Sequence, residues 1–403
     1  MPNTKLSELS IGLHSLTVFK ALKNDPVIKA LMTFLDNVDD VTTAEAVELY
    51  SNVASNLYAA NEENLSDYVK TIVGNDENIY IRDIGQGITP TTLLKKNVER
   101  ELEILQNVAN LTASELRQGV AWTEYLPGWN NPKVDLKEIY KDRTKNISKY
   151  GYGMYAQYHM FFIDKNNAIV PVKNPDPIRL SDLINYKREQ GIILDNTKAL
   201  LENKPASNIL LTGDAGTGKS STIKAVCNEL YTEGLRILEV RKEQLREIPG
   251  ILDELAVNPL KFIIFIDDLS FAKNDDNYTA LKAILEGSIS AKSKNVVIYA
   301  TSNRRHIINE KFSDRDDDVS KNDSMQESVS LSERFGIQIW FQRPDKQTYL
   351  DIVTHLLDAH KIKYDVEKVK IEAEKFALSR ANRSARAAKQ FVDQVLTEAI
   401  SVK

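Results

Sequence analysis

The sequence predicts an α/β fold in which a parallel five-stranded sheet is flanked by helices, with a mainly α-helical domain before it and a helical lid after it. From about residue 178, short apolar or β-rich runs alternate with helical patterns, which is typical of a parallel sheet covered on both faces. A glycine-rich loop separates the first of these runs from a helical pattern. No strand pattern follows Pro344. We therefore expect four regions, at 1–148 (helical), 149–177 (aromatic β-hairpin and linker), 178–343 (α/β core with the glycine-rich loop) and 344–403 (lid).

The first region has clear helix-start signals. Thr42-Thr-Ala-Glu45 and Thr112-Ala-Ser-Glu115 read as capping boxes, and apolar residues at helical spacing predict a long helix from about Thr91 to Asn110. The β-branched run Asn78–Asp83 suggests a short strand. No pattern in this region is typical of catalysis, so we expect a helical domain whose apolar stripes form its core, with partner binding as the alternative.

The second region is rich in aromatic residues. Six of them, Tyr150, Tyr152, Tyr155, Tyr158, Phe161 and Phe162, precede an Asp/Asn-rich turn and a second apolar run, which predicts a hairpin. Interleaved aromatics can stack nucleobases, yet few cations lie near them, so packing is the favoured interpretation. Asn174-Pro-Asp-Pro177 then predicts a linker.

Five runs are predicted to form the sheet of the third region, with helical patterns between them. They are Ile209–Leu211, Arg236–Val240, Phe262–Ile266, Val296–Ala300 and Ile337–Phe341. Ligand chemistry in such a sheet is expected at the carboxyl ends of the strands. Helical stretches near 345–361, 366–378 and 383–402 then form the lid.

The glycine-rich loop fits the pattern G-x-x-x-x-G-K-[ST] between a predicted strand and a predicted helix, which is the context of a phosphate-binding loop. Its residues are Gly213, Asp214, Ala215, Gly216, Thr217, Gly218, Lys219, Ser220 and Ser221. The glycines permit backbone conformations that turn N–H groups toward phosphate oxygens, and the helix adds the positive end of its dipole. Lys219 is expected on the β- and γ-phosphates of ATP, and the Ser220 hydroxyl on Mg²⁺.

Two acids end the third predicted strand. Asp267 and Asp268 follow the apolar run Lys261–Ile266 directly. Acids after a strand also cap turns, but downstream of a phosphate loop they suit a metal site. We expect Asp267 to enter the Mg²⁺ shell and Asp268 to act on an attacking water as general base.

The chain resembles the AAA+ ATPases, because the remaining motifs occur in the order of that superfamily. Val296–Asn303 resembles the sensor-1 strand, which implies that Asn303 orients the water. Leu331-Ser-Glu-Arg334-Phe resembles the arginine-finger segment, which implies that Arg334 enters a neighbouring subunit's site. Arg383–Phe391 resembles sensor 2, which implies that Arg386 contacts phosphates, and Ile178–Tyr186 resembles the segment beside adenine.

The same motifs resemble an uncharacterised bacterial family of AAA+ ATP-binding proteins, a domain of unknown function, over roughly 150–400. Two positions depart from the usual AAA+ pattern: Asp268 stands where most members have Glu, and Ser384 and Ala385 replace the sensor-2 glycine. Three other arginines, Arg304, Arg305 and Arg315, compete with Arg334 for the finger role.

Composition limits the partners. The net charge of −5 gives no support to nucleic acid as a ligand, although a local basic surface stays open. The single cysteine excludes an intramolecular disulfide, and no signal peptide or membrane-length apolar run is recognisable, so we expect a cytoplasmic protein.

We expect a Mg²⁺-dependent ATPase that forms homo-oligomers, because Arg334 acts in trans, and that remodels a macromolecular client. The alternative is a nucleotide-switched loader or adaptor of the helicase-loader or initiator type with little turnover. The Asp267–Asp268 pair mildly favours this alternative, since initiators also carry two aspartates there. The segment Val240–Leu245 lacks an aromatic residue, which argues against threading of polypeptide through a pore.

Overall fold

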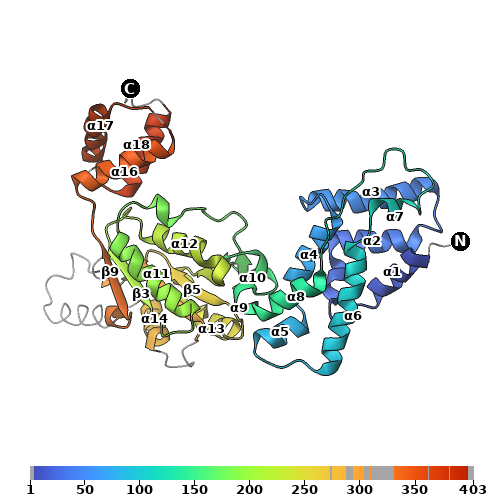
Figure 1. The fold of residues 1–403 in the computed structure, drawn as a ribbon. Helices are drawn as coiled ribbons and strands as arrows, with labels where there is room; N and C mark the ends of the chain where they lie inside the picture. The colour runs from blue at the N-terminus through green and yellow to red at the C-terminus, as the bar shows by residue number, and fades with distance from the viewer. Residues whose placement is uncertain are drawn as a thin grey trace. The chain divides into compact units, whose positions relative to one another are not determined.

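The computed structural model describes residues 4–272, 275–286, 294–303, 308–309, 331–361, 363–380 and 382–397. The chain forms two compact units, Met1–Gln157 and Tyr158–Lys403 (Figure 1). Arg304, Arg305 and Arg315 lie outside the described residues. Within the described ranges, no helix is long and apolar enough to cross a membrane.

The first unit is helical, as predicted. Its helices are α1 (Thr4–His14), α2 (Pro26–Asn37), α3 (Thr43–Ala59), α4 (Leu65–Asn75), α5 (Ile79–Gly85), α6 (Thr92–Ala109), α7 (Ala113–Arg117), α8 (Leu136–Lys145), α9 (Ile147–Tyr150) and α10 (Met154–Gln157), with a 3₁₀ turn at Lys20–Asn24. They surround one apolar core that includes Leu13, Phe34, Tyr50 and Leu105. Both predicted capping boxes are present, at Thr42 and at Thr112.

One expectation for this unit is wrong. The run from Asn78 to Asp83 belongs to helix α5 and forms no strand. The Asn78 side chain accepts a hydrogen bond from the Ile81 backbone N–H at 3.0 Å, which makes Asn78 the N-cap of the helix. The local cap therefore outweighs the β propensity of the isoleucines.

The second unit contains a seven-stranded sheet, so the expected count of five strands needs correction. All five predicted runs are strands: β3 (Ile209–Gly213), β4 (Leu235–Glu239), β5 (Lys261–Ile266), β7 (Val296–Ser302) and β9 (Ile337–Phe341). The predicted hairpin, β1 (Met160–Ile163) and β2 (Ile169–Pro171), extends the same sheet, in the order β2-β1-β4-β5-β7-β3-β9. Strand β1 pairs parallel with β4 and antiparallel with β2, and the other neighbours pair in parallel. A separate pair joins β6 (Phe271–Ala272) and β8 (Ile308–Asn309).

The aromatic block that suggested the hairpin is divided between the units. Phe161 and Phe162 lie in β1, whereas Tyr152 and Tyr155 are buried in the first unit. Three of the six side chains, Tyr152, Tyr155 and Phe161, are buried, whereas Tyr150 and Phe162 are exposed.

Helices connect the strands of the sheet. They are α11 (Lys187–Leu201), α12 (Lys219–Leu230), α13 (Ile248–Ala256) and α14 (Asp276–Glu286), with 3₁₀ turns at Leu180–Asp182, Tyr231–Glu233 and Lys242–Glu247. The connection from β3 to β4 passes β7 and β5 in one direction along the sheet. The connections from β4 to β5 and from β5 to β7 run in the opposite direction. Right-handed crossovers therefore place α12 on one face and α13 and α14 on the other. Ile193 of α11 and Val226 of α12 share a core with alternate strand residues such as Ile263 and Ile339.

Three helices follow β9, as predicted: α16 (Lys346–Ala359), α17 (Val366–Ser379) and α18 (Ala385–Leu396). They pack on one another around Tyr349, Val353, Ala373 and Phe391, which form their own apolar core (Figure 1). These helices therefore form a small bundle within the second unit.

Candidate active site

The predicted phosphate loop lies between β3 and α12, at the carboxyl edge of the sheet. Gly213, Gly216 and Gly218 all have positive φ angles, of 143°, 79° and 93°. At Gly213 a Cβ atom would lie 2.2 Å from the carbonyl oxygen of Phe341 on the neighbouring strand β9. The loop therefore requires glycine here for its conformation and for the close approach of two backbones.

Lys219 begins α12 and turns back over the loop. Its side chain is buried, and Nζ donates to the carbonyl oxygens of Gly213 at 2.9 Å and Asp214 at 2.8 Å, and to Asn303 Oδ1 at 3.0 Å. Burial lowers the pKa of this ammonium from its ordinary value, while the carboxylates of Asp267, Asp214 and Asp268 oppose the shift.

The rest of the loop is partly held by its own side chains. Thr217 is buried, and its Oγ1 donates to the Asp214 carbonyl at 2.9 Å. Ala215 is exposed, and Ser221 lies partly buried in the first turn of α12. The nine predicted loop residues thus run from the last residue of β3, through the turn at 214–218, into the first turn of α12.

Asp267 follows β5 and is held by hydroxyl groups from two other elements. Its Oδ1 accepts hydrogen bonds from Ser220 Oγ at 2.6 Å and from Thr301 Oγ1 at 2.5 Å. Ser220 comes from α12 and Thr301 from β7, which lies between β3 and β5 in the sheet. The arrangement places a carboxylate beside the serine of the phosphate loop.

Asp268 and Asn303 form a second pair at the same edge. Asp268 has a φ of +52°, which is uncommon for a residue with a Cβ. Its backbone N–H donates to Thr301 Oγ1 at 3.0 Å and Asp267 Oδ1 at 3.1 Å. Asn303 Nδ2 donates to Asp268 Oδ1 at 2.7 Å, while its Oδ1 accepts from Lys219. The amide therefore presents its donor to the carboxylate and its acceptor to the ammonium, as their charges require.

Arg386, in the first turn of α18, contacts the loop through its backbone. Its N–H donates to the Gly216 carbonyl at 3.3 Å, while its side chain is exposed. A Cβ atom at Gly216 would lie 3.0 Å from both Ser384 Oγ and Arg386 Cβ. The helical bundle thus contacts the phosphate loop at the start of α18.

Arg334 lies with Glu286, the last residue of α14, rather than among the residues that hydrogen-bond Lys219. Its Nε donates to Glu286 Oε1 at 2.8 Å, and Nη2 contacts the same oxygen. The structure thus brings together Lys219, Ser220, Asp267, Asp268 and Asn303, places Arg386 beside the loop and pairs Arg334 with another element.

The sequence profile of the family described as "Protein of unknown function (DUF815)" matches residues 156–399, which is more than half of the chain. The chain belongs to this family. The match confirms the predicted resemblance to an uncharacterised family that is defined by a domain of unknown function.

Two other comparisons add little. No curated protein matches this DUF815 chain. Among solved structures, the Holliday junction branch migration motor RuvB of Thermotoga maritima and two substituted forms of it are similar, at 12% sequence identity. They cover 54% of this chain and 72% of the motor, with TM-scores of 0.33, 0.33 and 0.34.

In this DUF815 member, two residues at the site were not expected from the sequence. Thr301 contacts both aspartates, and Arg343 Nε lies 3.3 Å from Asp214 Oδ2. Thr301 belongs to the run Val296–Asn303, and its polar side chain near the end of a strand is the one feature of the sequence that indicates a role at the site. Arg343 follows β9, and no local pattern in the sequence indicates its partner.

The segment expected beside adenine lies near the same edge. Tyr186 precedes α11, its ring packs against Phe341 with centroids 4.7 Å apart, and its hydroxyl donates to the Gln342 carbonyl. Burial raises the pKa of this phenol. Tyr186 therefore connects the segment before α11 with the chain that leaves β9 for the helical bundle.

The oxygen atoms at the site suit Mg²⁺. The hydroxyl of Ser220 and the carboxylate of Asp267 are 2.6 Å apart, and both are hard oxygen ligands. Among the described residues, no cluster of three His, Cys, Asp or Glu side chains could form an all-protein metal cage. This donor set fits a cation that takes its remaining ligands from phosphates and water.

Proposed function

We propose that this protein binds and hydrolyses Mg²⁺-ATP and uses the nucleotide cycle, as a homo-oligomer, to remodel a macromolecular client. The carrying observation is the hydrogen-bonded cluster of Lys219, Ser220, Asp267, Asp268 and Asn303 at the carboxyl ends of β3, β5 and β7. This cluster supports a role for Lys219 in binding phosphate, for Ser220 and Asp267 in binding a metal ion and for Asp268 in activating water.

Each group at the site has a separate role in the proposed hydrolysis. The loop N–H groups between Gly213 and Ser221 bind phosphate oxygens, and Lys219 exchanges its two loop carbonyls for the β- and γ-phosphates. Ser220 and Asp267 would hold Mg²⁺, which would offset charge on the phosphates. Asp268 accepts a proton from the attacking water, and Asn303 fixes the orientation of that carboxylate.

Two arginines complete the proposed site. Arg386 extends from the start of α18 to the phosphates, so that the helical bundle acts as a lid that responds to the nucleotide. Arg334 enters the site of a neighbouring subunit and offsets charge that develops on the γ-phosphate.

A second candidate function is that of a nucleotide-switched loader or adaptor with little turnover. It is favoured by Asp268, whose carboxylate is one methylene shorter than the usual glutamate and is held by Asn303 at 2.7 Å. In this case ATP occupancy, rather than its hydrolysis, controls association with a client. A single-turnover measurement separates the two, because the switch predicts that bound ATP is hydrolysed much more slowly than it is exchanged.

Substitution of Lys219 tests the site. We expect Lys219→Ala to weaken ATP binding by about tenfold to a hundredfold, because charged hydrogen bonds contribute ~1.5–3 kcal/mol each. Lys224→Ala is the matched control, since Lys224 lies on the same helix with its ammonium 3.8 Å from Glu239. Titration with Mg²⁺-ATP by calorimetry measures both variants.

Asp268→Asn separates binding from chemistry. This variant is expected to bind ATP like the wild type and to release no phosphate, because an amide cannot accept the proton of the water. Hydrolysis at the wild-type rate by Lys219→Ala or by Asp268→Asn would refute the assignment of the site.

A further inference from the structure

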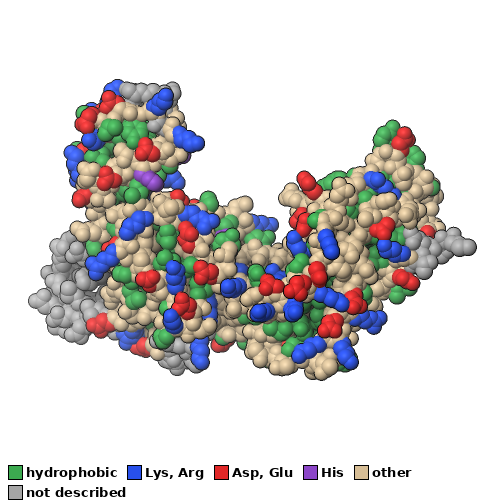
Figure 2. Space-filling model, in the orientation of Figure 1, with side chains coloured by type: hydrophobic (Ala, Val, Ile, Leu, Met, Phe, Trp, Pro, Cys, Tyr) green, Lys and Arg blue, Asp and Glu red, His purple; other side chains and the backbone are tan. Residues whose placement is uncertain are grey.

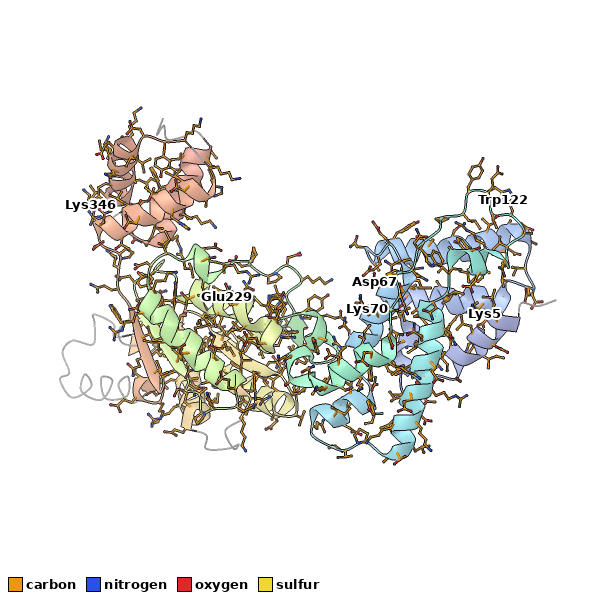
Figure 3. The ribbon with its side chains drawn as sticks, in the orientation of Figure 1. Lys5, Asp67, Lys70, Trp122, Glu229 and Lys346 are labelled. Carbon is orange, nitrogen blue, oxygen red and sulfur yellow. The ribbon has the colours of Figure 1, made fainter. Side chains whose placement is uncertain are left out.

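The loop at 118–135 joins α7 to α8 in the first unit and contains no helix or strand. Near its tip the side chains of Trp122 and Tyr125 are 40% and 79% exposed, and their ring centroids lie 5.5 Å apart. Figure 3 shows Trp122 at the projecting end of this loop. Long loops within a compact domain are uncommon unless they are functional or disordered, and large exposed aromatics are typical of binding surfaces.

The base of the loop is firmly held. Trp129 stacks on Tyr50 with centroids 5.9 Å apart, and its Nε1 donates to the Leu111 carbonyl at 3.1 Å. Asn131 Nδ2 donates to the same carbonyl at 2.8 Å, and the Tyr50 hydroxyl donates to Pro127. Ordered contacts therefore fix the base, while the aromatic pair near the tip stays exposed, a combination that pre-organises a binding surface.

A pocket of about 760 Å³ opens at the base of the same loop. The ionisable side chains that line it are Arg117 and Lys133, and polar or aromatic neighbours include Ser114, Trp129 and Asn130. Arg117 also donates from Nη2 to the carbonyl of Leu126, the residue after Tyr125. One arginine thus connects the cationic pocket with the aromatic tip.

We propose that the aromatic tip and the cationic pocket bind an extended segment of a partner protein in which carboxylates stand beside apolar side chains. The rings of Trp122 and Tyr125 offer a large apolar contact area at a small entropic cost, because each side chain has few rotatable bonds. Arg117 and Lys133 complement carboxylates, which charge-assisted hydrogen bonds then position. This proposal concerns the first unit alone and does not depend on the proposed ATPase activity.

A polypeptide suits this surface better than a nucleic acid. The loop at 118–135 contains one cation, Lys133, which suits pairing with a single carboxylate rather than with a run of phosphates, and the net charge of the chain is −5. On the face of the first unit visible in Figure 2, cationic and anionic side chains are interspersed without an extended basic stripe. Stacking on aromatics alone, without such a stripe, is a weak basis for binding single strands.

The experiment uses the full-length chain and a displayed library of random short peptides. We expect selection to enrich peptides that combine Asp or Glu with apolar residues. The most enriched peptide is then synthesised with a fluorescent label and titrated against the wild type by anisotropy. Its affinity should fall by about tenfold in Trp122→Ser/Tyr125→Ser and in Lys133→Gln, as is usual for central contacts of an interface.

Matched controls keep the test specific. Tyr58→Ser removes another exposed tyrosine of the first unit, and Lys141→Gln removes another exposed lysine, so both should bind the peptide like the wild type. The melting temperature of each variant reports whether it folds. The proposal is overturned if no enriched peptide depends on Trp122 and Tyr125, if enriched peptides lack acidic residues, or if mixed-sequence single-stranded DNA binds this loop while peptides do not.

Discussion

At the scale of single residues, the site depends on the hydroxyl oxygen of Thr301, to which the sequence motifs assign no role. Thr301 Oγ1 donates to Asp267 Oδ1 and accepts from the Asp268 N–H, so it orients both acids at once. Asp268 has a positive φ, and the bond to Thr301 helps to hold that uncommon conformation. A positioning role of this kind should be visible in kinetics before it is visible in stability.

Thr301→Val tests this role, because valine keeps the shape of threonine and removes the hydroxyl. We expect kcat for ATP hydrolysis to fall by about tenfold or more, since the lost bonds involve a carboxylate. Nucleotide affinity should change little. Steady-state phosphate release measures the effect.

Thr212→Val on β3 is the control, because its hydroxyl donates a long hydrogen bond, at 3.5 Å, to the Ile339 carbonyl. Equal kcat values for Thr301→Val and the wild type would show that the backbone alone positions the two acids.

At the scale of elements, the junction between α4 and α5 contains a buried acid. Asp76 is the C-cap of α4, and its Oδ2 accepts from Asn78 Nδ2 at 2.8 Å. Burial raises the pKa of Asp76 to about 6, from an ordinary value of 3.8. The folded state therefore retains a proton between about pH 4 and pH 6 that the unfolded chain releases, so this group destabilises the first unit as pH rises through that window.

Asp76→Asn removes that titration while keeping an oxygen for Asn78. We expect the first unit to become more stable by on the order of 2 kcal/mol at pH 8, with the gain shrinking toward pH 4. Tryptophan fluorescence in a Trp340→Phe background measures thermal unfolding of this unit, because the other two tryptophans, Trp122 and Trp129, belong to it. A gain of equal size at pH 5 and pH 8 would contradict the mechanism.

Prediction from the sequence was most reliable where the signal is local. Apolar runs located β3, β4, β5, β7 and β9 to within a few residues, and the two capping boxes were correct. The pairing of β1 with β4 was not predicted, because it joins residues far apart in the chain and depends on which edge of the sheet is open. The contact of Arg343 with Asp214 is also long-range and has no local signal.

The helix at α5 illustrates the opposite error. Propensity over six residues favoured a strand, yet a single side-chain hydrogen bond from the Ile81 N–H to Asn78 starts a helix. Single contacts of this kind determine whether a short segment forms a helix or a strand, because the propensities of a few residues sum to little free energy.

At the scale of the whole molecule, the proposed role of Arg334 requires that two subunits share each ATP site. The pairing of Arg334 with Glu286 keeps the expected arginine finger on its own subunit's α14 in this structure. A finger that acts in trans must exchange at least part of this contact for a phosphate when subunits assemble.

Mixing subunits tests that exchange. Arg334→Ala and Asp268→Asn are each expected to be inactive alone, whereas their mixture should regain part of the wild-type ATPase activity, because some interfaces combine an intact Asp268 with an intact Arg334 from the neighbour. Phosphate release as a function of mixing ratio measures the effect. An inactive mixture in which size-exclusion chromatography shows mixed oligomers would argue against a shared site.

The short connection into the sheet has a mechanical consequence. α10 ends at Gln157 and β1 begins at Met160, and the intervening His159 stacks on Tyr231 with centroids 4.6 Å apart and contacts Asn228 at 3.0 Å. Tension on the first unit therefore enters β1 at its first residue, and the parallel hydrogen bonds to β4 share that tension along the strand. Because Asn228 lies on the helix that begins with Lys219, a load carried by the first unit would reach the helix that follows the proposed phosphate-binding loop.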